Sequence, residues 1–507
     1  MALLRSKKAL MLYPLILSLF TTTIGLGIIL KPKEGWTVWA GQAWEAFKGT
    51  TAMTAKPVNT PTSPTVEYRV DAELEVANSN IHGVASITVP NSPDDTLLFY
   101  LYPSTHKPIE IKQVLVNGGA VRFQATPDHL LVPVKAKGET ANVQIQFSTP
   151  IPAAGTRLGQ QNGVWSLTYW YPILGVRDKG AWIPRPHPHP FGDPFLMDLS
   201  SYQVRLKHPQ DFVWFASGAL VSSTIENGMA VSEWKADSLR SFALIGGSGW
   251  DVATWRSPEG VDVKIAVRNP RHLPELKTLA EAAVKTYTKR FGALAYPYYS
   301  VVEMPTGTVF AHEYPNLALF SQEIWNWTNG EHWIAHEIAH GWWFSSVGTH
   351  KALDPWLDEG LADYASLLYN EAKYGRDAYN EAIARYWTMF RDGKSNAPHS
   401  FGRSVNVQDE SADQPYANFS NEADYYYLMY LRPALMYHDL RMSMGDPKFF
   451  DFLQQFYLKN RKSTVTRADL EESLSKVDPH ALPRLKLWLD APNKELIEHV
   501  KTRFTNP

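Results

Sequence analysis

The sequence predicts a multidomain protein of mixed α and β structure, with an all-β domain, then a mostly helical domain, preceded by one transmembrane helix. Three observations support this fold class. Short alternating segments with turn signals run from Val66 to about Trp250, helical patterns dominate after Val261, and an uncharged run spans Ala9 to Leu30. At 507 residues the chain also exceeds the size at which one hydrophobic core stops growing.

The first element is the uncharged run from Ala9 to Leu30, which follows a basic cluster at residues 5–8. A helix of about 20 residues crosses the hydrocarbon core of a bilayer. Charged residues follow at positions 31–34, and the nearest small-residue cleavage candidate is Ala40. We therefore expect an uncleaved single-pass anchor over residues 9–30, with residues 1–8 cytoplasmic and the body extracellular; a cleaved signal peptide is the alternative.

Residues 31–64 are expected to form a juxtamembrane spacer, because the segment ends in a Pro/Thr/Ser stretch. Residues 65–252 then read as a β-rich domain. Residues 68–76 alternate apolar and polar side chains, and Asn117-Gly118 and Asn227-Gly228 are hairpin turn signals.

A proline-dense segment at residues 184–190 interrupts this domain. It can form neither a helix nor a central strand, so it is expected to be a stiff loop. His187 and His189 within it could bind a metal, but the simpler interpretation is an ordinary loop.

Residues 253–507 form the predicted helical domain. One or two strands are expected first, at Val261–Val267 and Ser300–Met304, and residues 274–290 have apolar side chains at helical spacing.

Charge and cysteine content exclude several functional classes. The net charge is −2, from 49 basic and 51 acidic residues, so no basic surplus points to nucleic acid. The chain has no cysteine, which removes disulfides, thiolate zinc ligands and cysteine nucleophiles together.

The clearest chemical signature is an H-E-x-x-H motif at residues 336–340, in a segment of helix-forming composition. Residues i and i+4 share one helix face, so His336 and His340 can bind one ion while Glu337 lies beside it. Glu359, 19 positions after His340 on a second helix-like segment, can return to supply a third ligand. The sequence therefore predicts one Zn²⁺ per chain bound by these three residues, with a fourth position open and Glu337 as general base.

Two neighbouring residues need separate interpretations. His332 lies one turn before His336, but three histidines at this spacing cannot bind one ion, because the outer two are about 12 Å apart. His332 is therefore expected to be structural. Asp363, one turn after Glu359, either accepts a hydrogen bond from a ligand histidine or is a solvated carboxylate, and the sequence leaves both open.

Residues 336–343, His-Glu-Ile-Ala-His-Gly-Trp-Trp, and residues 356–362, Trp-Leu-Asp-Glu-Gly-Leu-Ala, resemble the zinc signature of the gluzincin aminopeptidases, the family of aminopeptidase N and leukotriene hydrolase. Residues 310–314 stand where that family has its exopeptidase motif Gly-Ala-Met-Glu-Asn. Tyr430 begins a segment that resembles the family's Tyr-x-Lys-Gly. The resemblance runs from about Glu67 to the C-terminus. The chain looks like a short, membrane-anchored, bacterial-like member of this family.

This resemblance implies a sandwich-like β domain followed by a thermolysin-like catalytic domain, without the large C-terminal helical domain of longer members. It implies a zinc-dependent aminopeptidase that acts on peptides by metal-assisted hydrolysis. Glu337 would take a proton from water and pass it to the leaving amine. Tyr430 would donate a hydrogen bond to the oxyanion, and Glu313 would pair with the free α-amine of the substrate.

The exopeptidase motif departs from the family pattern. Phe310 replaces glycine, His312 replaces methionine and Tyr314 replaces asparagine, so a side chain is expected to crowd the backbone that holds the peptide. Of the motif, only Ala311 and Glu313 are kept.

The tyrosine segment departs as well. Arg432 replaces lysine and Pro433 replaces glycine, so the helix is expected to kink there. Residues 425–427 are three rival tyrosines, which are expected to pack rather than to act.

Two alternatives share this fold. A thermolysin-like endopeptidase would use the same zinc site but would leave Glu313 without a partner. A catalytically inactive binding protein is the other alternative, although the complete set of ligands and the general base argue against it.

Overall fold

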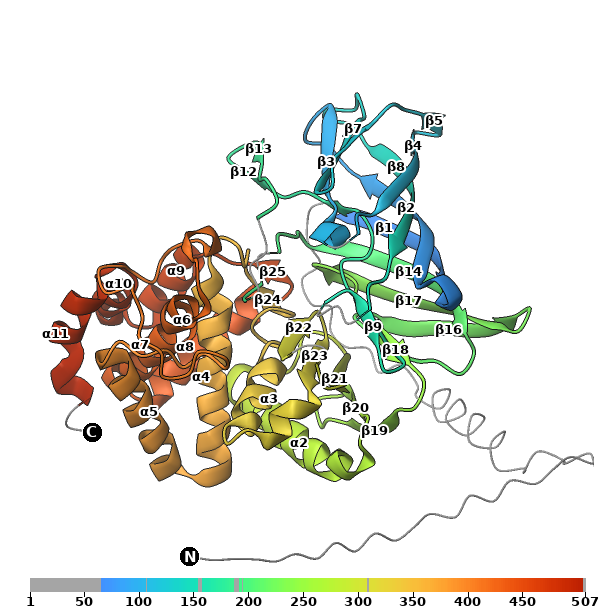
Figure 1. The fold of residues 1–507 in the computed structure, drawn as a ribbon. Helices are drawn as coiled ribbons and strands as arrows, with labels where there is room; N and C mark the ends of the chain where they lie inside the picture. The colour runs from blue at the N-terminus through green and yellow to red at the C-terminus, as the bar shows by residue number, and fades with distance from the viewer. Residues whose placement is uncertain are drawn as a thin grey trace, which may run out of the picture. The chain divides into compact units, whose positions relative to one another are not determined.

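The computed structural model describes residues 65–105, 107–153, 157–186, 191–193, 195–307 and 310–504, which belong to one compact unit (Figure 1). The predicted cytoplasmic end, anchor and spacer, and His187 and His189, lie outside these residues. None of the described helices is long and apolar enough to cross a membrane. The anchor therefore stays a prediction from the sequence.

An eight-stranded sheet forms the largest part of the β-rich domain. Its strand order is β16-β17-β14-β1-β2-β8-β4-β5, and β1 pairs in parallel with β14. Side chains alternate along β1, so that Tyr68, Val70, Ala72 and Leu74 are buried while their neighbours face outward. The strands are β1 (Val66–Glu75), β2 (Asn80–Val89), β4 (Glu110–Val116), β5 (Gly119–Ala120), β8 (Ala141–Pro150), β14 (Ser200–Pro209), β16 (Ala219–Glu226) and β17 (Met229–Leu239).

Both predicted hairpin turns are present in this sheet. Asn117 and Gly118, between β4 and β5, and Asn227 and Gly228, between β16 and β17, all have positive φ. Asn-Gly favours this conformation, which matches the twist of the strands that it joins.

Three smaller sheets complete the domain, with the orders β15-β18-β10-β9, β11-β3-β7-β6 and β12-β13. The two four-stranded sheets share one hydrophobic core with the eight-stranded sheet. Their strands are β3 (Thr96–Tyr100), β6 (Gln124–Ala125), β7 (His129–Pro133), β9 (Gly159–Gln161), β10 (Val164–Leu167), β11 (Ile173–Leu174), β15 (Val213–Ala216) and β18 (Leu244–Gly247), and the hairpin is β12 (Arg177–Asp178) and β13 (Ala181–Trp182).

A five-stranded sheet begins the second half of the chain, in the order β19-β20-β21-β23-β22. The predicted strands correspond to β20 (Asp262–Val267) and β21 (Tyr298–Met304). The sequence missed β19 (Asp251–Arg256), β22 (Ala311–Tyr314) and β23 (Leu317–Ser321). The predicted domain boundary at residues 252 and 253 falls inside β19, and the domain limits stay a prediction.

Helices dominate from residue 273 onward, and α2 and α3 lie beside the five-stranded sheet (Figure 1). The predicted helix at 274–290 is confirmed as α2 (Leu273–Phe291). The others are α3 (Gly330–Ala339), α4 (Pro355–Tyr374), α5 (Arg376–Arg391), α6 (Glu422–Tyr426), the π-helical η6 (Tyr427–Leu431), α7 (Arg432–Met444), α8 (Asp446–Asn460), α9 (Arg467–Val477), α10 (Leu482–Asp490) and α11 (Asn493–Phe504); short β24 (Val347–Gly348) pairs with β25 (Ser463–Thr464).

A buried arginine joins the β-rich half to the helical half. Arg240 follows β17, and its guanidinium donates hydrogen bonds to the carbonyl of Phe344 (2.9 Å) and the hydroxyl of Thr464 (3.2 Å). A Cβ at Gly348 would lie 1.9 Å from the guanidinium carbon, so only glycine allows this close approach. The arginine therefore helps to hold the β-rich half against the segment that follows α3.

Candidate active site

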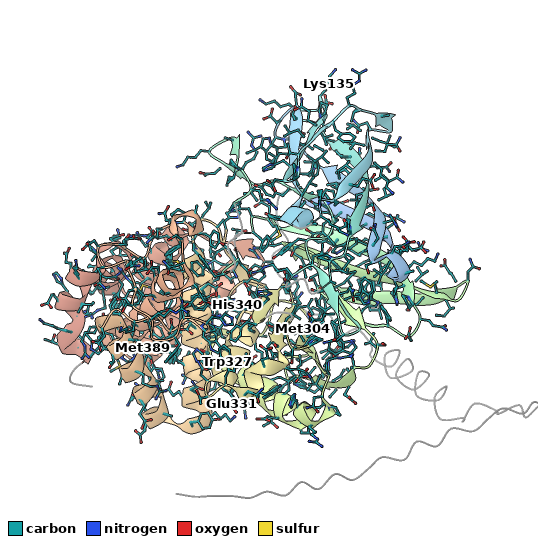
Figure 2. The ribbon with its side chains drawn as sticks, viewed as in Figure 1. Lys135, Met304, Trp327, Glu331, His340 and Met389 are labelled. Carbon is teal, nitrogen blue, oxygen red and sulfur yellow. The ribbon has the colours of Figure 1, made fainter. Side chains whose placement is uncertain are left out.

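Two packed helices bring the predicted ligands together. His336 lies on the last turn of α3, His340 is the residue after that helix, and Glu359 lies on the first turns of α4. All three side chains are buried in the interior of the unit. Figure 2 labels His340 to mark the place of the site. His336 Nε2 lies 3.1 Å from His340 Nε2 and 3.3 Å from Glu359 Oε2, and His340 Nε2 lies 3.4 Å from the same oxygen.

These separations fit a zinc ion. Bonds of about 2.0–2.1 Å in a tetrahedral arrangement place ligand atoms about 3.3 Å apart. The three atoms face one another, as expected for ligands of one ion. Burial lowers the pKa of His336, but the side chains of Asp363 and Glu359 outweigh that effect and raise it to about 10. The surroundings therefore stabilise positive charge at this point, as a site for a divalent cation must.

Glu337 lies beside the triad, on the same helix. Its side chain lines the pocket, and its Oε2 atom is buried without a hydrogen-bond partner among the described residues. Burial raises the pKa of the Glu337 carboxyl to about 7, although the neighbouring histidines oppose this. An unpartnered carboxylate of this kind can accept a proton from water.

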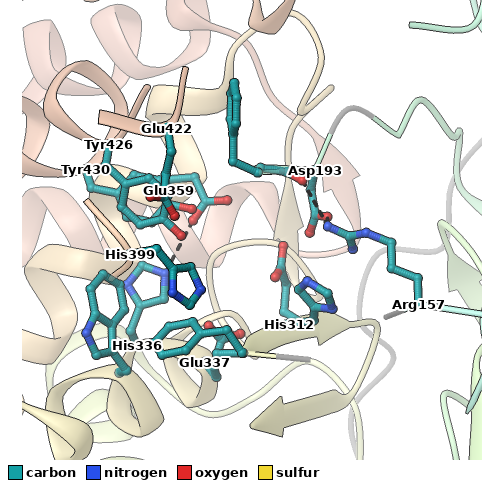
Figure 3. A pocket seen from close by; sticks show the side chains of 16 residues that line it. Arg157, Asp193, His312, His336, Glu337, Glu359, His399, Glu422, Tyr426 and Tyr430 are labelled. Atoms are coloured by element: carbon teal, nitrogen blue, oxygen red, sulfur yellow. Dashed lines mark hydrogen bonds and ion pairs between the residues drawn. The ribbon is translucent and has the colours of Figure 1, made fainter. Parts of the chain in front are cut away.

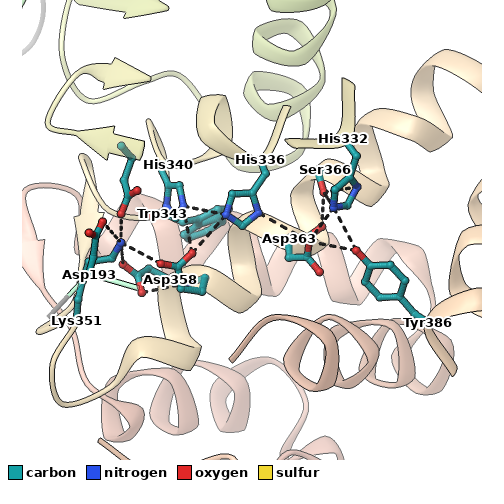
Figure 4. A network of polar contacts seen from close by, with 12 residues as sticks. Asp193, His332, His336, His340, Trp343, Lys351, Asp358, Asp363, Ser366 and Tyr386 are labelled. Carbon is teal, nitrogen blue, oxygen red and sulfur yellow. Dashed lines mark hydrogen bonds and ion pairs between the residues drawn. The ribbon is translucent and has the colours of Figure 1, made fainter. Parts of the chain in front are cut away.

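A polar network behind the ligands involves Asp363 (Figure 4). Asp363 is fully buried, so the solvated interpretation is wrong. Its Oδ1 atom lies 2.8 Å from His332 Nε2 and 3.8 Å from His336 Nδ1, on the side of His336 away from the ligand cluster. His332 also contacts Ser366 (3.0 Å) and Tyr386 (3.1 Å), in agreement with its predicted structural role. The Asp363 carboxylate therefore lies behind the His336 ring, at ion-pair distance from Nδ1.

Lys351 lies on the other side of the ligand cluster, and the sequence did not predict this. Its ammonium is 3.1 Å from Glu359 Oε1, the oxygen that does not face the histidines. It also forms an ion pair with Glu313 and lies 3.5 Å from Asp193 and 3.6 Å from Asp358 (Figure 4). Burial alone would raise the pKa of Glu359, but Lys351 and the histidines hold it well below its usual value.

Glu313 lies on β22, the edge strand of the five-stranded sheet, and is buried at the pocket wall. The strand keeps regular pairing with β23, from Ala311 opposite Phe320 to Tyr314 opposite Leu317. The pairing of residues 311–314 is therefore that of an ordinary edge strand, and the effect of Phe310 on a bound peptide stays a prediction. The Phe310 ring lines the pocket and packs on Trp327, with ring centroids 4.8 Å apart.

The other two departures in this motif have different surroundings. His312 lines the pocket, and its pKa is lowered to about 3 by burial and by the nearby Arg157, so the ring is neutral. Tyr314 is buried and packs near Tyr169, with ring centroids 5.7 Å apart.

Tyr430 lies in the π-helical turn η6, and its ring stacks on His336 with centroids 5.4 Å apart. Burial raises the pKa of the Tyr430 hydroxyl, which keeps it able to donate a hydrogen bond. Of the rivals, Tyr426 also lines the pocket, whereas Tyr427 donates to the carbonyl of Phe390 (2.7 Å) and Tyr425 packs on Phe191 (5.4 Å).

The expected kink at Pro433 takes the form of this wide turn. Proline has no N–H to donate, so the preceding turn lacks one α-helical hydrogen bond. Pro433 packs against Gly360, where a Cβ would lie 2.3 Å from the ring. This contact sets η6 directly beside Glu359. Arg432 points elsewhere and donates to the carbonyl of Trp488 (2.8 Å), so it is structural.

The site opens into a pocket (Figure 3). Both halves of the chain contribute to its lining. The lining residues are Arg157, Phe191, Gly192 and Asp193 from the β-rich half, and Phe310, Ala311, His312, Glu313, Trp333, His336, Glu337, Glu359, His399, Glu422, Tyr426 and Tyr430 from the helical half.

Comparison with known proteins agrees with this geometry. Residues 284–488 match the family model described as "Peptidase family M1 domain". The chain carries a peptidase family M1 domain. This confirms the resemblance drawn from the zinc motif, because the matched residues include α3, α4 and η6.

Curated relatives of the M1 domain are aminopeptidases by name. Human Aminopeptidase RNPEPL1 is 28% identical over 180 residues, which is 32% of this chain and 23% of that protein. Leucine aminopeptidase 2 of Emericella nidulans is 22% identical, over 41% of this chain and 34% of that protein. The chain thus spans between a fifth and about a third of the length of these relatives.

Solved structures show that the likeness extends beyond the M1 domain. The M1 zinc metallopeptidase of Deinococcus radiodurans superposes with a TM-score of 0.62 at 18% identity, over 84% of this chain and 95% of that one. Aminopeptidase A of Legionella pneumophila gives 0.64 at 17% identity, over 86% of this chain and 51% of that one. The fold is therefore that of the M1 metallopeptidases, with a β-rich N-terminal domain and a helical C-terminal part.

Sequence reasoning missed three charged residues beside the site: Arg157 and Asp193, which line the pocket, and Lys351. Arg157 and Asp193 form an ion pair, and Asp193 also faces Lys351. Asp193 lies just beyond the proline-dense loop, and no periodic pattern marks any of the three. Lys351 follows Thr349 and His350 and precedes Ala352, so its neighbours in the sequence gave no signal of burial.

Proposed function

We propose that the protein is a zinc-dependent aminopeptidase, which removes N-terminal residues from peptides by hydrolysis. One observation carries this: the ligand atoms of His336, His340 and Glu359 have the separations of a zinc site. Beside them lies Glu337, whose Oε2 atom has no hydrogen-bond partner among the described residues. The matching M1 family and the names of the relatives support the same activity.

The residues of this chain have distinct tasks in the proposed reaction. Zinc, when bound by His336, His340 and Glu359, supplies a Lewis acid for the scissile carbonyl and the attacking water. The Glu337 carboxylate accepts a proton from that water and returns it to the leaving amine nitrogen. Tyr430, whose ring lies on His336, donates a hydrogen bond to the oxygen that gains negative charge.

Recognition of the free amine rests on two neighbouring carboxylates, those of Glu313 and Glu337. Glu313, Glu337 and His340 each place one ligand atom within 4.8 Å of the others. Two carboxylates this close favour a cation between them, and the α-ammonium of a peptide would supply it. The outer edge of β22 leaves backbone groups with which an extended peptide can pair.

Activity on free and blocked substrates tests the proposed function. We expect the zinc-loaded protein to cleave aminoacyl p-nitroanilides faster than their N-acetyl derivatives. Glu313→Gln is expected to lower kcat/KM for the free-amine substrates about tenfold, equivalent to about 1.4 kcal/mol, and to affect the blocked ones little. Glu323→Gln, on an exposed side chain of a short 3-10 helix after β23, is the matched control.

Each alternative has its own outcome in this assay. Equal cleavage of internal peptide bonds and of free N-termini would favour a thermolysin-like endopeptidase. Binding of peptides without any turnover by the zinc-loaded protein would favour a binding protein on the same fold.

We also propose that residues 9–30 anchor the protein in a membrane as a single pass, with the catalytic body extracellular. We further propose that the β domain is sandwich-like and that the helical half is thermolysin-like. The uncharged run between basic residues supports the anchor, and the family resemblance supports the two fold types.

Fractionation tests the anchor. The full chain is expected to stay with membranes after a high-salt wash, whereas a chain that starts at Pro64 is expected in the soluble fraction. A mature N-terminus near Gly41 would show instead that a signal peptide had been removed.

A further inference from the structure

Lys351 is a buried ammonium surrounded by acidic groups. Only 4% of its side chain is exposed, and its Nζ atom faces four carboxylates, those of Asp193, Glu313, Asp358 and Glu359. Burying a lysine is costly unless its charge is compensated, so these contacts account for its position. The ring of Phe344 covers another side at 5.0 Å.

Among these contacts, the ion pair with Glu313 bears most directly on substrate recognition. It joins the Lys351 ammonium to Glu313 Oε1, the carboxylate that lines the pocket. The carboxylate to which the family resemblance assigns the substrate amine therefore already has a positive partner within the protein. Asp193, the next acid along the pocket, is likewise paired with Arg157.

This pairing changes the electrostatics of substrate binding. A carboxylate without a partner would be left uncompensated when a blocked, neutral N-terminus covered it, and the blocked substrate would bind poorly. With Lys351 present, Glu313 stays compensated whichever substrate is bound. An incoming α-ammonium must also share Glu313 with the lysine, so it gains less.

We propose that Lys351 is a specificity-determining residue: by neutralising Glu313 from inside the protein, it weakens the discrimination between free and blocked N-termini. The proposal rests on the proposed function, in which Glu313 recognises the amine. It assigns the protein a substrate class that extends to peptides with an acylated N-terminus.

Binding of two matched inhibitors tests the proposal without turnover. Leucine hydroxamate and N-acetyl-leucine hydroxamate differ at the amine, and calorimetry on the zinc-loaded full chain gives the Kd of each. For Lys351→Met we expect the ratio of the blocked to the free Kd to rise at least about tenfold, or ~1.4 kcal/mol. Without the lysine, the free ligand's ammonium no longer shares the Glu313 carboxylate with a second cation, whereas the blocked ligand leaves that carboxylate uncompensated.

A double-mutant cycle shows whether the effect passes through Glu313. In a Glu313→Gln background, Lys351→Met should leave the Kd ratio unchanged, because the carboxylate that the lysine and the ligand's ammonium would share is gone. An effect that acts through Glu359 would persist in that background. Zinc content by elemental analysis should be equal in all variants.

Lys264→Met is the matched control, because Lys264 is a partly buried lysine on β20 whose ammonium faces the Phe215 ring at 5.6 Å. It should change neither Kd. Lys351→Gln, which keeps a polar end, replaces the methionine variant if that variant fails to fold.

An unchanged or lower Kd ratio in Lys351→Met would overturn the role of Lys351 and leave the proposed function standing. Loss of zinc from that variant would overturn it too, because the lysine would then act on the metal site. If the zinc-loaded wild type bound neither hydroxamate, the proposed function itself would fail, and the inference with it.

Discussion

Glu337→Gln is expected to lower kcat by about 10²–10⁴-fold, the usual contribution of general acid–base catalysis, while zinc content and thermal stability stay unchanged. Glutamine has the same shape as glutamate but cannot take up the proton of the attacking water. The wild-type carboxylate is buried at the pocket beside the ligand triad, and none of the residues that the structure describes pairs with its Oε2 atom. Steady-state kinetics on an aminoacyl p-nitroanilide, together with elemental analysis, measures both quantities.

Glu331→Gln is the control for this variant, because Glu331 lies on the first turn of the same helix and pairs with Lys373 at 2.6 Å, away from the ligands. It should retain wild-type kcat. Near-normal turnover in Glu337→Gln would assign Glu337 a structural role.

His336→Ala is expected to abolish stoichiometric zinc binding and, with it, activity. Its imidazole supplies one of the three zinc ligands. Zinc affinity should therefore fall by more than the roughly 10–100-fold that is typical when a residue hydrogen-bonded to a ligand is removed. The substitution also removes the imidazole that lies 3.8 Å from the fully buried carboxylate of Asp363. Equilibrium dialysis against buffered zinc measures the change in affinity.

The control for zinc binding is His208→Ala. His208 is also buried, but it lies on β14 and contacts Ser232 at 2.9 Å in the β-rich domain. This variant should keep one zinc per chain. A His336→Ala protein that retained full zinc content would contradict the assignment of the metal site.

The metal site was predictable from local sequence. Two of its ligands and the general base lie within one helical turn, where the period of the helix alone decides which side chains share a face. Glu359 could be named because a second helix-like segment follows at a distance that allows a return. The structure places it 3.3 Å and 3.4 Å from the two histidine nitrogens.

The strands beside the site were harder to predict. β23 is buried at every position, so it has no alternation, and β22 is only four residues long. A short buried run cannot be distinguished from part of a helix by periodicity.

The sequence by itself determined the chemistry of the metal site, because residue type and helical spacing act over a few positions. Only the tertiary structure decided which charges compensate one another around that site. Lys351 meets Glu313, Asp193 and Glu359 from segments up to about 160 residues apart. A buried ion pair depends on where distant segments cross and on the exclusion of water between them, and neither is written in the order of neighbouring residues.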